Sequence, residues 1–335
     1  MNPVVDPAGW FPKELEENKD WIFELSQNEC DEIQVAVASA EKRGLEIKKI
    51  CRSDFVLSQG LSNRLQEIRE ECLNGRGLAL LRGLPVDKMS RGQIATALWG
   101  VGTYLGVAVS QNGKGHLLGH VKDLGGNYLT KDTRGYFTNA EMGFHADRCD
   151  YVGLLCLQTA KSGGESCVAS SVTLYNEILR QRPDLVAELL KEFCWSRTGE
   201  IPPGKGPFYK MPVFSFEGGH LSARGVSKQI YESQGMEGVD GFTDKQMEAL
   251  KFYREQVKKL SFEMEFRQGD LQFLCSHVTL HTRRRFKDWK DPSRKRHLLR
   301  LWLHDDKGRP IPKVYREIIN GIELEGVKLT TPLEV

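Results

Sequence analysis

From about residue 115 onward, the sequence alternates short strand-like segments with glycine-rich turns. Strand-like segments include GHLLGHVKD, VGLLCLQTA, FYKMPVFSF, LSFEMEFRQGDLQFLC and RHLLRLWL, and turns such as DLGGN, KSGGES and FEGGH separate them. Many short strands with glycine turns are typical of a β-sandwich or a jelly roll. Two helical stretches, one over 171–193 and one starting after Thr243, interrupt the strands. The pattern predicts a mixed α+β fold with a sandwich or jelly-roll core.

The first part of the chain has a different, helical pattern. ECDEIQVAVASAEKRG and LSNRLQEIREECLNGRG place apolar residues at helical spacing, and each ends near glycine. Two capping boxes, Ser90 with Gln93 and Thr243 with Gln246, predict helices near 91–105 and 244–260. No change in composition marks a boundary. We therefore expect one domain over residues 1–335, with a helical part of about 1–75 packed on the β core.

The charge and the cysteines narrow the class of protein. The formal net charge is +2, which gives no overall field for nucleic acid or a membrane surface. The basic run TRRRFKDWKDPSRKRH is interrupted by Asp288 and Asp291, and this favours a solvated loop. The 8 cysteines are scattered without a CxxC pair, as is typical of free thiols in a reducing compartment. With no signal peptide and no apolar span, we expect a soluble cytoplasmic protein without membrane or nucleic-acid partners.

The segment GFHADRCD carries a candidate metal motif. On a strand, His145 and Asp147 share one face, where an imidazole and a carboxylate can occupy adjacent positions on one metal ion. With 8 histidines and 45 acidic residues in the chain, roughly one such triplet is expected by chance. A polar strand face with a His–Asp hydrogen bond is the alternative, so the motif depends on a third ligand elsewhere.

The segment LQFLCSHVTLHTRRRF supplies two candidates for that ligand, His277 and His281. Two histidines and one carboxylate form a facial triad, which leaves three coordination positions open and favours non-haem Fe(II) chemistry with O2. The absence of thiolate from this ligand set argues against a structural zinc site.

A third segment, SRKRHLLRLWL, places two arginines on one face of a strand. Arg296, Leu298, Arg300 and Trp302 alternate with Leu299, Leu301 and Leu303. If the arginine face lines a barrel interior, its guanidinium groups need anions. Arg–carboxylate salt bridges would satisfy them, and so would two small anionic molecules, each held by a bidentate fork.

In this order, the segments resemble the TauD/TfdA family of Fe(II)/2-oxoglutarate dioxygenases, which also contains clavaminate synthase-like enzymes. FHADRCDYVGLLCLQTAKSGGES is similar to the family's His-x-Asp strand and turn, GDLQFLCSHVTLHTR to its distal-histidine block, and RKRHLLRLWL to its closing arginine strand. GLALLRGLP is similar to an N-terminal strand of the family. The resemblance runs from about residue 75 to 305. It implies a double-stranded β-helix, that is, a jelly-roll core with flanking helices.

The resemblance also implies roles for individual residues. His145, Asp147 and His281 match the iron ligands, whereas His277 matches none and is interpreted as a packing histidine. Arg296 matches the family's arginine that binds the distal carboxylate of 2-oxoglutarate. Ser166 matches the hydroxyl residue that donates to the same carboxylate. The implied cofactors are Fe(II), 2-oxoglutarate as co-substrate, and O2.

The implied reaction couples oxidative decarboxylation of 2-oxoglutarate to oxidation of an unactivated C–H bond, by hydroxylation, desaturation or ring closure. Arg300 matches an arginine that binds an anionic substrate in several members, which implies an amino acid or a small organic acid. We add Asn139 and His116 as candidate polar contacts to the substrate, with turn hydrogen bonding or packing as the alternative. Ser276, where many members have asparagine, argues against a taurine or sulfonate substrate.

Two other function classes remain at this stage. One is a jelly-roll metal-dependent hydrolase or isomerase that uses the same ligands with zinc. The other is a non-catalytic, ligand-sensing member of the fold, against which the complete ligand set argues. The sequence is compatible with a homo-oligomer and leaves the oligomeric state, the substrate and the oxidised position open.

Overall fold

The computed structural model describes residues 1–335 except 129, 131–132 and 323. The helices are α1 (Pro12–Glu17), α2 (Gln27–Lys42), α3 (Gln59–Leu73), α4 (Arg91–Gly102), α5 (Ser171–Gln181), α6 (Pro183–Leu189), α7 (Lys228–Glu232), α8 (Asp244–Lys259) and α9 (Lys313–Arg316). The strands are β1 (Ile22–Glu24), β2 (Leu78–Arg82), β3 (Val107–Ala108), β4 (Leu118–Val121), β5 (Tyr151–Gln158), β6 (Ser162–Gly163), β7 (Ser166–Ser170), β8 (Phe193–Ser196), β9 (Phe208–Met211), β10 (Phe214–Glu217), β11 (His220–Ala223), β12 (Ser261–Met264), β13 (Leu271–Cys275), β14 (Thr279–Arg283), β15 (Phe286–Lys287) and β16 (His297–His304).

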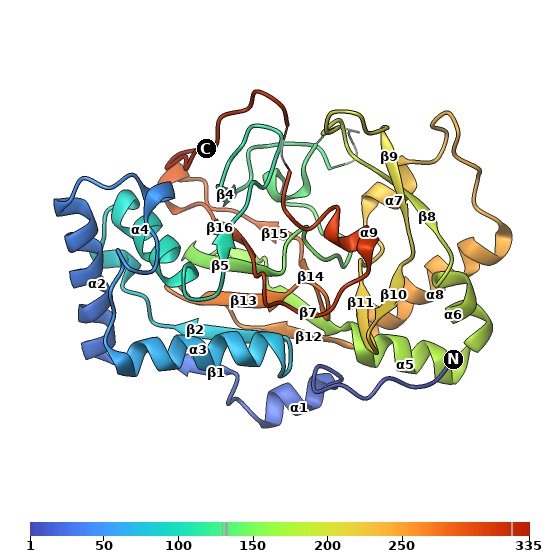
Figure 1. Cartoon of the computed structure of the whole chain (residues 1–335), viewed down its shortest axis with the longest axis horizontal. Coiled ribbons are helices and arrows are strands. Elements are labelled where there is room, and N and C mark those ends of the chain that lie inside the picture. The colour runs from blue at the N-terminus through green and yellow to red at the C-terminus, as the bar shows by residue number, and fades with distance from the viewer. Residues whose placement is uncertain (129, 131–132, 323) are drawn as a thin grey trace.

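Two sheets form the core. The larger has the order β1-β2-β13-β5-β16-β3, with β4 also paired to β16, and the smaller has the order β12-β7-β14. Strands far apart in sequence are neighbours in both sheets, and β13, β5 and β16 pair antiparallel. This is the jelly-roll arrangement predicted from the short strands. Figure 1 shows α2 and α4 at one end of the sheets, α3 running alongside β2, and α5, α6 and α8 at the other end.

The alternation of side chains on β16 separates the inside of the jelly roll from its outside. Leu299, Leu301 and Leu303 belong to the cluster that includes the apolar faces of α2, α3 and α4. Leu298 and Trp302 belong to a second cluster, with residues of β2, β5 and β7. Because successive side chains on a strand point to opposite faces, Arg300 shares the face of Leu298 and Trp302. The strand therefore holds a charged side chain inside the core.

Local sequence signals account for several helix starts. Both predicted capping boxes are present, at Ser90 for α4 and at Thr243 for α8. The helical stretch expected over 171–193 is instead two helices, which break at Arg182 with φ −146° and ψ 71°. Pro183 explains the break, because proline disfavours the helical conformation of the residue before it and suits the first position of a new helix. Within the described residues, no helix is long and apolar enough to cross a membrane.

The buried carboxylate of Asp150, just before β5, forms hydrogen bonds with the chain before β14 and with the end of β16. Asp150 accepts hydrogen bonds from His277 Nε2 and His304 Nδ1, each at 2.7 Å, and from the backbone N–H of Asp305 at 2.9 Å. Burial would raise the pKa of Asp150, but the hydrogen bond from His277 and the other contacts outweigh it and lower that pKa. His277 thus packs against Asp150, as expected for a histidine that is not a metal ligand.

We expect Asp150→Ala to lower the free energy of unfolding by about 3–5 kcal/mol at neutral pH, the usual cost of removing one partner of a buried charged network. Because the folded-state pKa lies below the unfolded one, this contribution is fully present above about pH 4 and is lost as the pH falls through the folded-state value. Urea unfolding across this range measures it. Asp306→Ala, at a 92% exposed carboxylate beside His304, is the control. Equal stability of Asp150→Ala and wild type at pH 7 would contradict the prediction.

Candidate metal centre

Two histidines lie side by side where the smaller sheet meets the segment before β5. The backbone N–H of His145 donates to the carbonyl of His281 at 3.1 Å, and the N–H of His281 donates back at 2.9 Å. Their ring centroids are 4.4 Å apart. Asp147, two residues further along, points the same way, and one ligand atom from each of the three residues lies within 4.8 Å of the others. The three predicted ligands therefore converge, although Asp147 itself lies outside a regular strand.

Gly225 makes room for this pairing on the other side of His145, with which it forms an isolated bridge. Its φ is +80°, and a Cβ atom there would lie 2.8 Å from the Cα of His145. A side chain at this position would be strained and would push the histidine away from its partner. The close approach of the two backbones is thus part of the geometry of the site.

The protonation states suit metal ligands. Burial would raise the pKa of Asp147, but Arg300 and the two imidazoles outweigh it and lower the pKa to about 2. Burial, together with the like charge of His145, lowers the pKa of His281 to about 3, and burial also lowers the pKa of His145. At neutral pH the carboxylate is ionised and both imidazoles are neutral, which is the form that binds metal. The 3.8 Å contact between His281 Nε2 and Asp147 Oδ2 is therefore not an ion pair.

Unsatisfied atoms indicate that the three residues fit a cation. Asp147 Oδ2 and His281 Nδ1 are buried without a hydrogen-bond partner in the described structure. His145 Nδ1 lies 2.9 Å from the carbonyl oxygen of Gly143, which can only accept, so Nδ1 carries the proton and Nε2 has a free lone pair. A buried carboxylate oxygen without a donor is costly. A divalent metal bound by these atoms would remove that cost.

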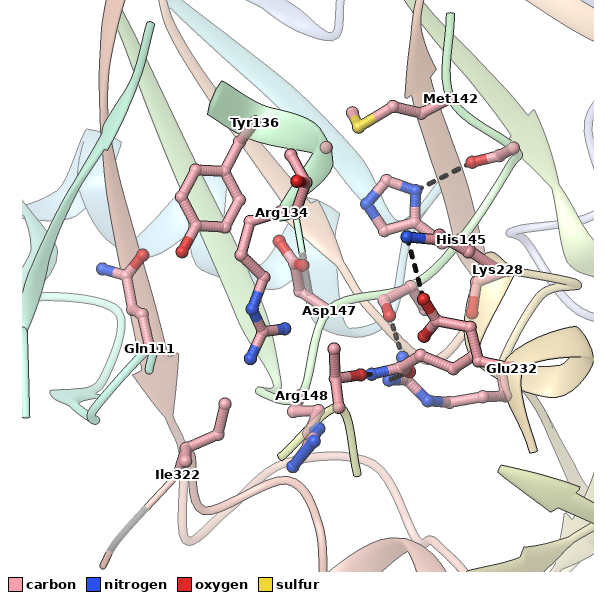
Figure 2. A pocket seen from close by; sticks show the side chains of 18 of the residues that line it. Gln111, Arg134, Tyr136, Met142, His145, Asp147, Arg148, Lys228, Glu232 and Ile322 are labelled. Carbon is pink, nitrogen blue, oxygen red and sulfur yellow. Dashed lines mark hydrogen bonds and ion pairs between the residues drawn. The ribbon is translucent and has the colours of Figure 1, made fainter. Parts of the chain in front are cut away.

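The predicted substrate arginine lines a cavity of about 150 Å³ beside the three ligands. Arg300 donates from Nε to Gln111 Oε1 at 2.7 Å, and its guanidinium lies over the rings of Tyr136 and Trp302, at 4.7 and 4.9 Å. Gln111 in turn donates to the carbonyl oxygens of Leu117 and Arg300. Figure 2 shows Tyr136 and Arg134 beside Asp147, with Met142 and Arg148 at opposite ends of the cavity. Arg300 is thus held in place before any ligand binds.

Arg296 lies just before β16 and lines a different cavity, of about 180 Å³. It is 5% exposed, donates from Nη2 to the carbonyl of Gly164 at 3.3 Å, and has no hydrogen-bond partner at Nη1 among the described residues. Burial lowers its pKa to about 10. Ser166 follows that same turn and donates to Gln272 Oε1 at 3.1 Å. Arg296 therefore contacts the turn that precedes Ser166, and its free Nη1 remains available to an anion.

The two other candidate contacts lie away from the metal centre. Asn139 is exposed, and its backbone carbonyl accepts a hydrogen bond from Phe286. His116 is half-buried and pairs with Thr330 in an isolated bridge. Neither residue is among those that line the cavity beside the ligands. Adjacency in sequence, on which both predictions depend, therefore does not bring these residues to the cavity.

Three buried arginines at the site were not anticipated. Arg148 and Arg224 line the cavity beside the ligands and are 5% and 6% exposed. Arg283 follows His281 by two residues on β14, lies 4.7 Å over the ring of Phe286, and has Nε and Nη1 without partners in the described structure. Burial, followed by the like charge of Arg296, lowers the pKa of Arg283 to about 9. In the sequence, only the positions of Arg148 and Arg283 directly after the two candidate ligand motifs could have indicated that they lie near the site.

Two histidines and a carboxylate between the sheets of a jelly roll define the class of non-haem metal oxygenases. Comparison with known proteins agrees. The model of the taurine catabolism dioxygenase TauD, TfdA family matches residues 41–302. The chain is 31% identical to FR-33289 synthase of Streptomyces rubellomurinus, over 92% of this chain and 93% of that protein. It is 28% identical to the taurine hydroxylase-like protein SAT17 of Stachybotrys chartarum, over 90% and 80%.

Solved structures share the fold. An asparagine oxygenase in complex with Fe(II), 2S,3S-3-hydroxyasparagine and succinate matches with a TM-score of 0.66 and 17% identity, over 85% of this chain and 93% of that one. The non-haem iron oxygenase OrfP with Fe and α-ketoglutaric acid matches with a TM-score of 0.63 and 13% identity, over 85% and 94%.

The chain belongs to the TauD/TfdA family. It is a dioxygenase, and enzymes of this family use Fe(II), 2-oxoglutarate and O2. The family, the jelly-roll core and the cofactors predicted from the three motifs are confirmed.

Proposed function

We propose that this enzyme oxidises an unactivated C–H bond of a small anionic substrate, an amino acid or an organic acid. The observation that carries the proposal is the convergence of His145, Asp147 and His281 beside a cavity into which Arg300 is fixed. The asparagine oxygenase and OrfP structures hold hydroxylated asparagine and hydroxylated arginine together with succinate. These neighbours favour an amino acid and hydroxylation over desaturation or ring closure.

In this proposal each side chain has a distinct task. His145, Asp147 and His281 hold Fe(II), while Arg296, with the hydroxyl of Ser166, holds the distal carboxylate of 2-oxoglutarate. When bound, iron and 2-oxoglutarate supply the oxidising power for the C–H bond. The chain's own residues position that bond and exclude water.

Arg300 is the positioning group for the substrate anion. Its Nε is occupied by Gln111, and its nearest contact to Asp147 Oδ1, at 3.7 Å, is longer than a hydrogen bond. The remaining N–H groups therefore stay available to a carboxylate. The rings of Tyr136 and Trp302 cover the guanidinium and keep it away from bulk water. A charge-assisted contact in such a site is stronger than one at the surface.

A substrate screen tests the proposal, with amino acids and small carboxylates scored by stimulated conversion of 2-oxoglutarate to succinate. For a substrate so found, we expect Arg300→Gln to raise the KM by about 10- to 100-fold, because one charge-assisted contact is lost. The KM for 2-oxoglutarate should stay unchanged. Arg180→Gln, at an exposed position of α5, is the matched control. An unchanged substrate KM, or an equal rise in both constants, would refute the role given to Arg300.

A further inference from the structure

The cavity beside the metal centre has an excess of positive charge. Its described lining includes five cationic side chains and two carboxylates. A third carboxylate, outside the lining, pairs with one of these cations, so the excess is two positive charges. The cationic residues are Arg134, Arg148, Arg224, Lys228 and Arg300. Histidine binds a metal in its neutral form, so the two imidazoles add no charge to this count. Fe(II) with a 2-oxoglutarate dianion would leave this excess unchanged.

The ion pairs around the cavity show which cationic side chains lack a carboxylate partner. Glu200 pairs with Arg134, and Glu232 pairs with Lys228 at 2.8 Å. The other carboxylate of the lining, Asp147, belongs to the proposed metal ligands. Arg148 and Arg224 therefore lack a carboxylate of their own, and neither forms an ion pair with any described residue.

Arg148 is the more exceptional of the two. It follows Asp147 directly, is 5% exposed, and its Nη2 is buried without a hydrogen-bond partner in the described part of the chain. In Figure 2 its guanidinium lies at the end of the cavity opposite Met142. An isolated buried charge costs several kcal/mol, so a guanidinium kept here without a partner indicates an absent anion.

Arg224 approaches the cavity from the end of β11. One of its terminal nitrogens donates to the carbonyl of Ala146, between the two metal ligands, and the other donates to Gln229 Oε1 at 3.4 Å. Its Nε has no partner among the described residues. These bonds fix the plane of the guanidinium, while its positive charge stays uncompensated.

Tyr209 of β9 supports this picture of two uncompensated cations. Burial alone would raise the pKa of its phenol, but the guanidinium groups of Arg224 and Arg148 outweigh burial and lower that pKa. Both guanidinium groups thus act on the same phenol, and Arg197 adds a third cation 5.1 Å from the tyrosine ring. This end of the pocket thus has a strongly positive potential.

We propose that Arg148 and Arg224 form an oxyanion-binding subsite of the substrate pocket. The substrate then carries one anionic group here and a second at Arg300, so it is a dianion: a dicarboxylate or an acid with a phosphonate group. The subsite rests on the proposed function, because it specifies the substrate class of the same pocket. Two guanidinium forks give bidentate contacts to either kind of oxyanion.

The test measures binding to the enzyme loaded with Fe(II) and 2-oxoglutarate without O2, by calorimetry and by the visible charge-transfer band. The probes are 3-phosphonopropionate, glutarate and the monoanion butyrate. We expect both dianions, or the one whose oxyanion fits, to bind at least about tenfold more tightly than butyrate. Arg148→Gln should weaken dianion binding by about 10- to 100-fold and leave butyrate unaffected. Arg224→Gln should act in the same direction, and the exposed Arg180→Gln should bind as wild type does.

Each outcome separates the two proposals. If the charge-transfer band does not form in the wild type, the iron and 2-oxoglutarate centre fails as proposed. If the band forms but neither dianion binds more tightly than butyrate, the subsite is refuted. Equal dianion affinity of Arg148→Gln and wild type refutes it as well. Because Nη2 of Arg148 has no hydrogen-bond partner among the described residues, its glutamine variant is the safer one to fold, and an intact band verifies the site.

Discussion

Replacing His281 with alanine is expected to abolish Fe(II) binding and, with it, all turnover of 2-oxoglutarate. His281 supplies one of three converging candidate ligand atoms, and its backbone hydrogen bonds with His145 hold the two histidines side by side. A site with one histidine and one carboxylate loses a third of its protein ligands and most of its preference for Fe(II). Bound iron per protein chain, after removal of excess metal, and succinate formation measure the effect.

His220→Ala provides the matched control for this prediction. His220 is half-buried in β11, and its ring contacts Arg309 at 3.3 Å, away from the metal centre. This variant should bind iron and turn over 2-oxoglutarate as the wild type does. Retention of stoichiometric Fe(II) by His281→Ala would show that the metal is held elsewhere, and the assignment of the site would be wrong.

Replacing Arg296 with alanine should have two effects of opposite sign. Affinity for 2-oxoglutarate should fall by about 2–5 kcal/mol, or roughly 30-fold to several thousand-fold, the usual cost of losing one partner of a buried charge pair. The protein without 2-oxoglutarate should instead become more stable, because a 5% exposed guanidinium with a free Nη1 is removed from the interior. Titration of the Fe(II)-loaded enzyme and thermal unfolding with and without 2-oxoglutarate measure both effects.

Arg285→Ala is the control, since Arg285 is exposed in the same connection between β14 and β16. It should change neither quantity. A lower Tm of Arg296→Ala in the absence of 2-oxoglutarate would mean that Arg296 is already satisfied by the protein. An unchanged affinity would remove Arg296 from the 2-oxoglutarate site.

The parts of the fold that depend on local chemistry could be predicted from sequence. Capping boxes fixed the starts of α4 and α8, because their hydrogen bonds join residues three positions apart. The convergence of His145, Asp147 and His281 could also be predicted, since each motif places its residue on a strand or next to one. The break at Pro183 was visible too, yet the strong helical pattern on both sides outweighed it in the prediction.

The remaining features depend on the burial of individual side chains in the folded protein. Arg148 and Arg224 come from segments 76 positions apart, and no periodicity marks either one as buried. Asn139 lies close to His145 in sequence, but it is exposed and does not line the cavity. Charge without a partner is a property of three-dimensional packing, so only the structure could reveal it.

The stretch of chain between β7 and β12 runs from the first pair of ligands towards the last and forms its own small helical and β-hairpin layer at one end of the molecule (Figure 1). From this layer come Arg224, Lys228 and Glu232 at the cavity, whereas the three proposed ligands lie outside it. Part of the cavity lining therefore comes from a piece of chain that carries none of the three proposed ligands, while Arg148 and Arg300 come from the same parts of the chain as the ligands. Mutations in this layer can change which substrate fits the cavity without touching the three proposed ligands. Chimaeric proteins that exchange the segment between β7 and β12 with that of a relative would test this separation.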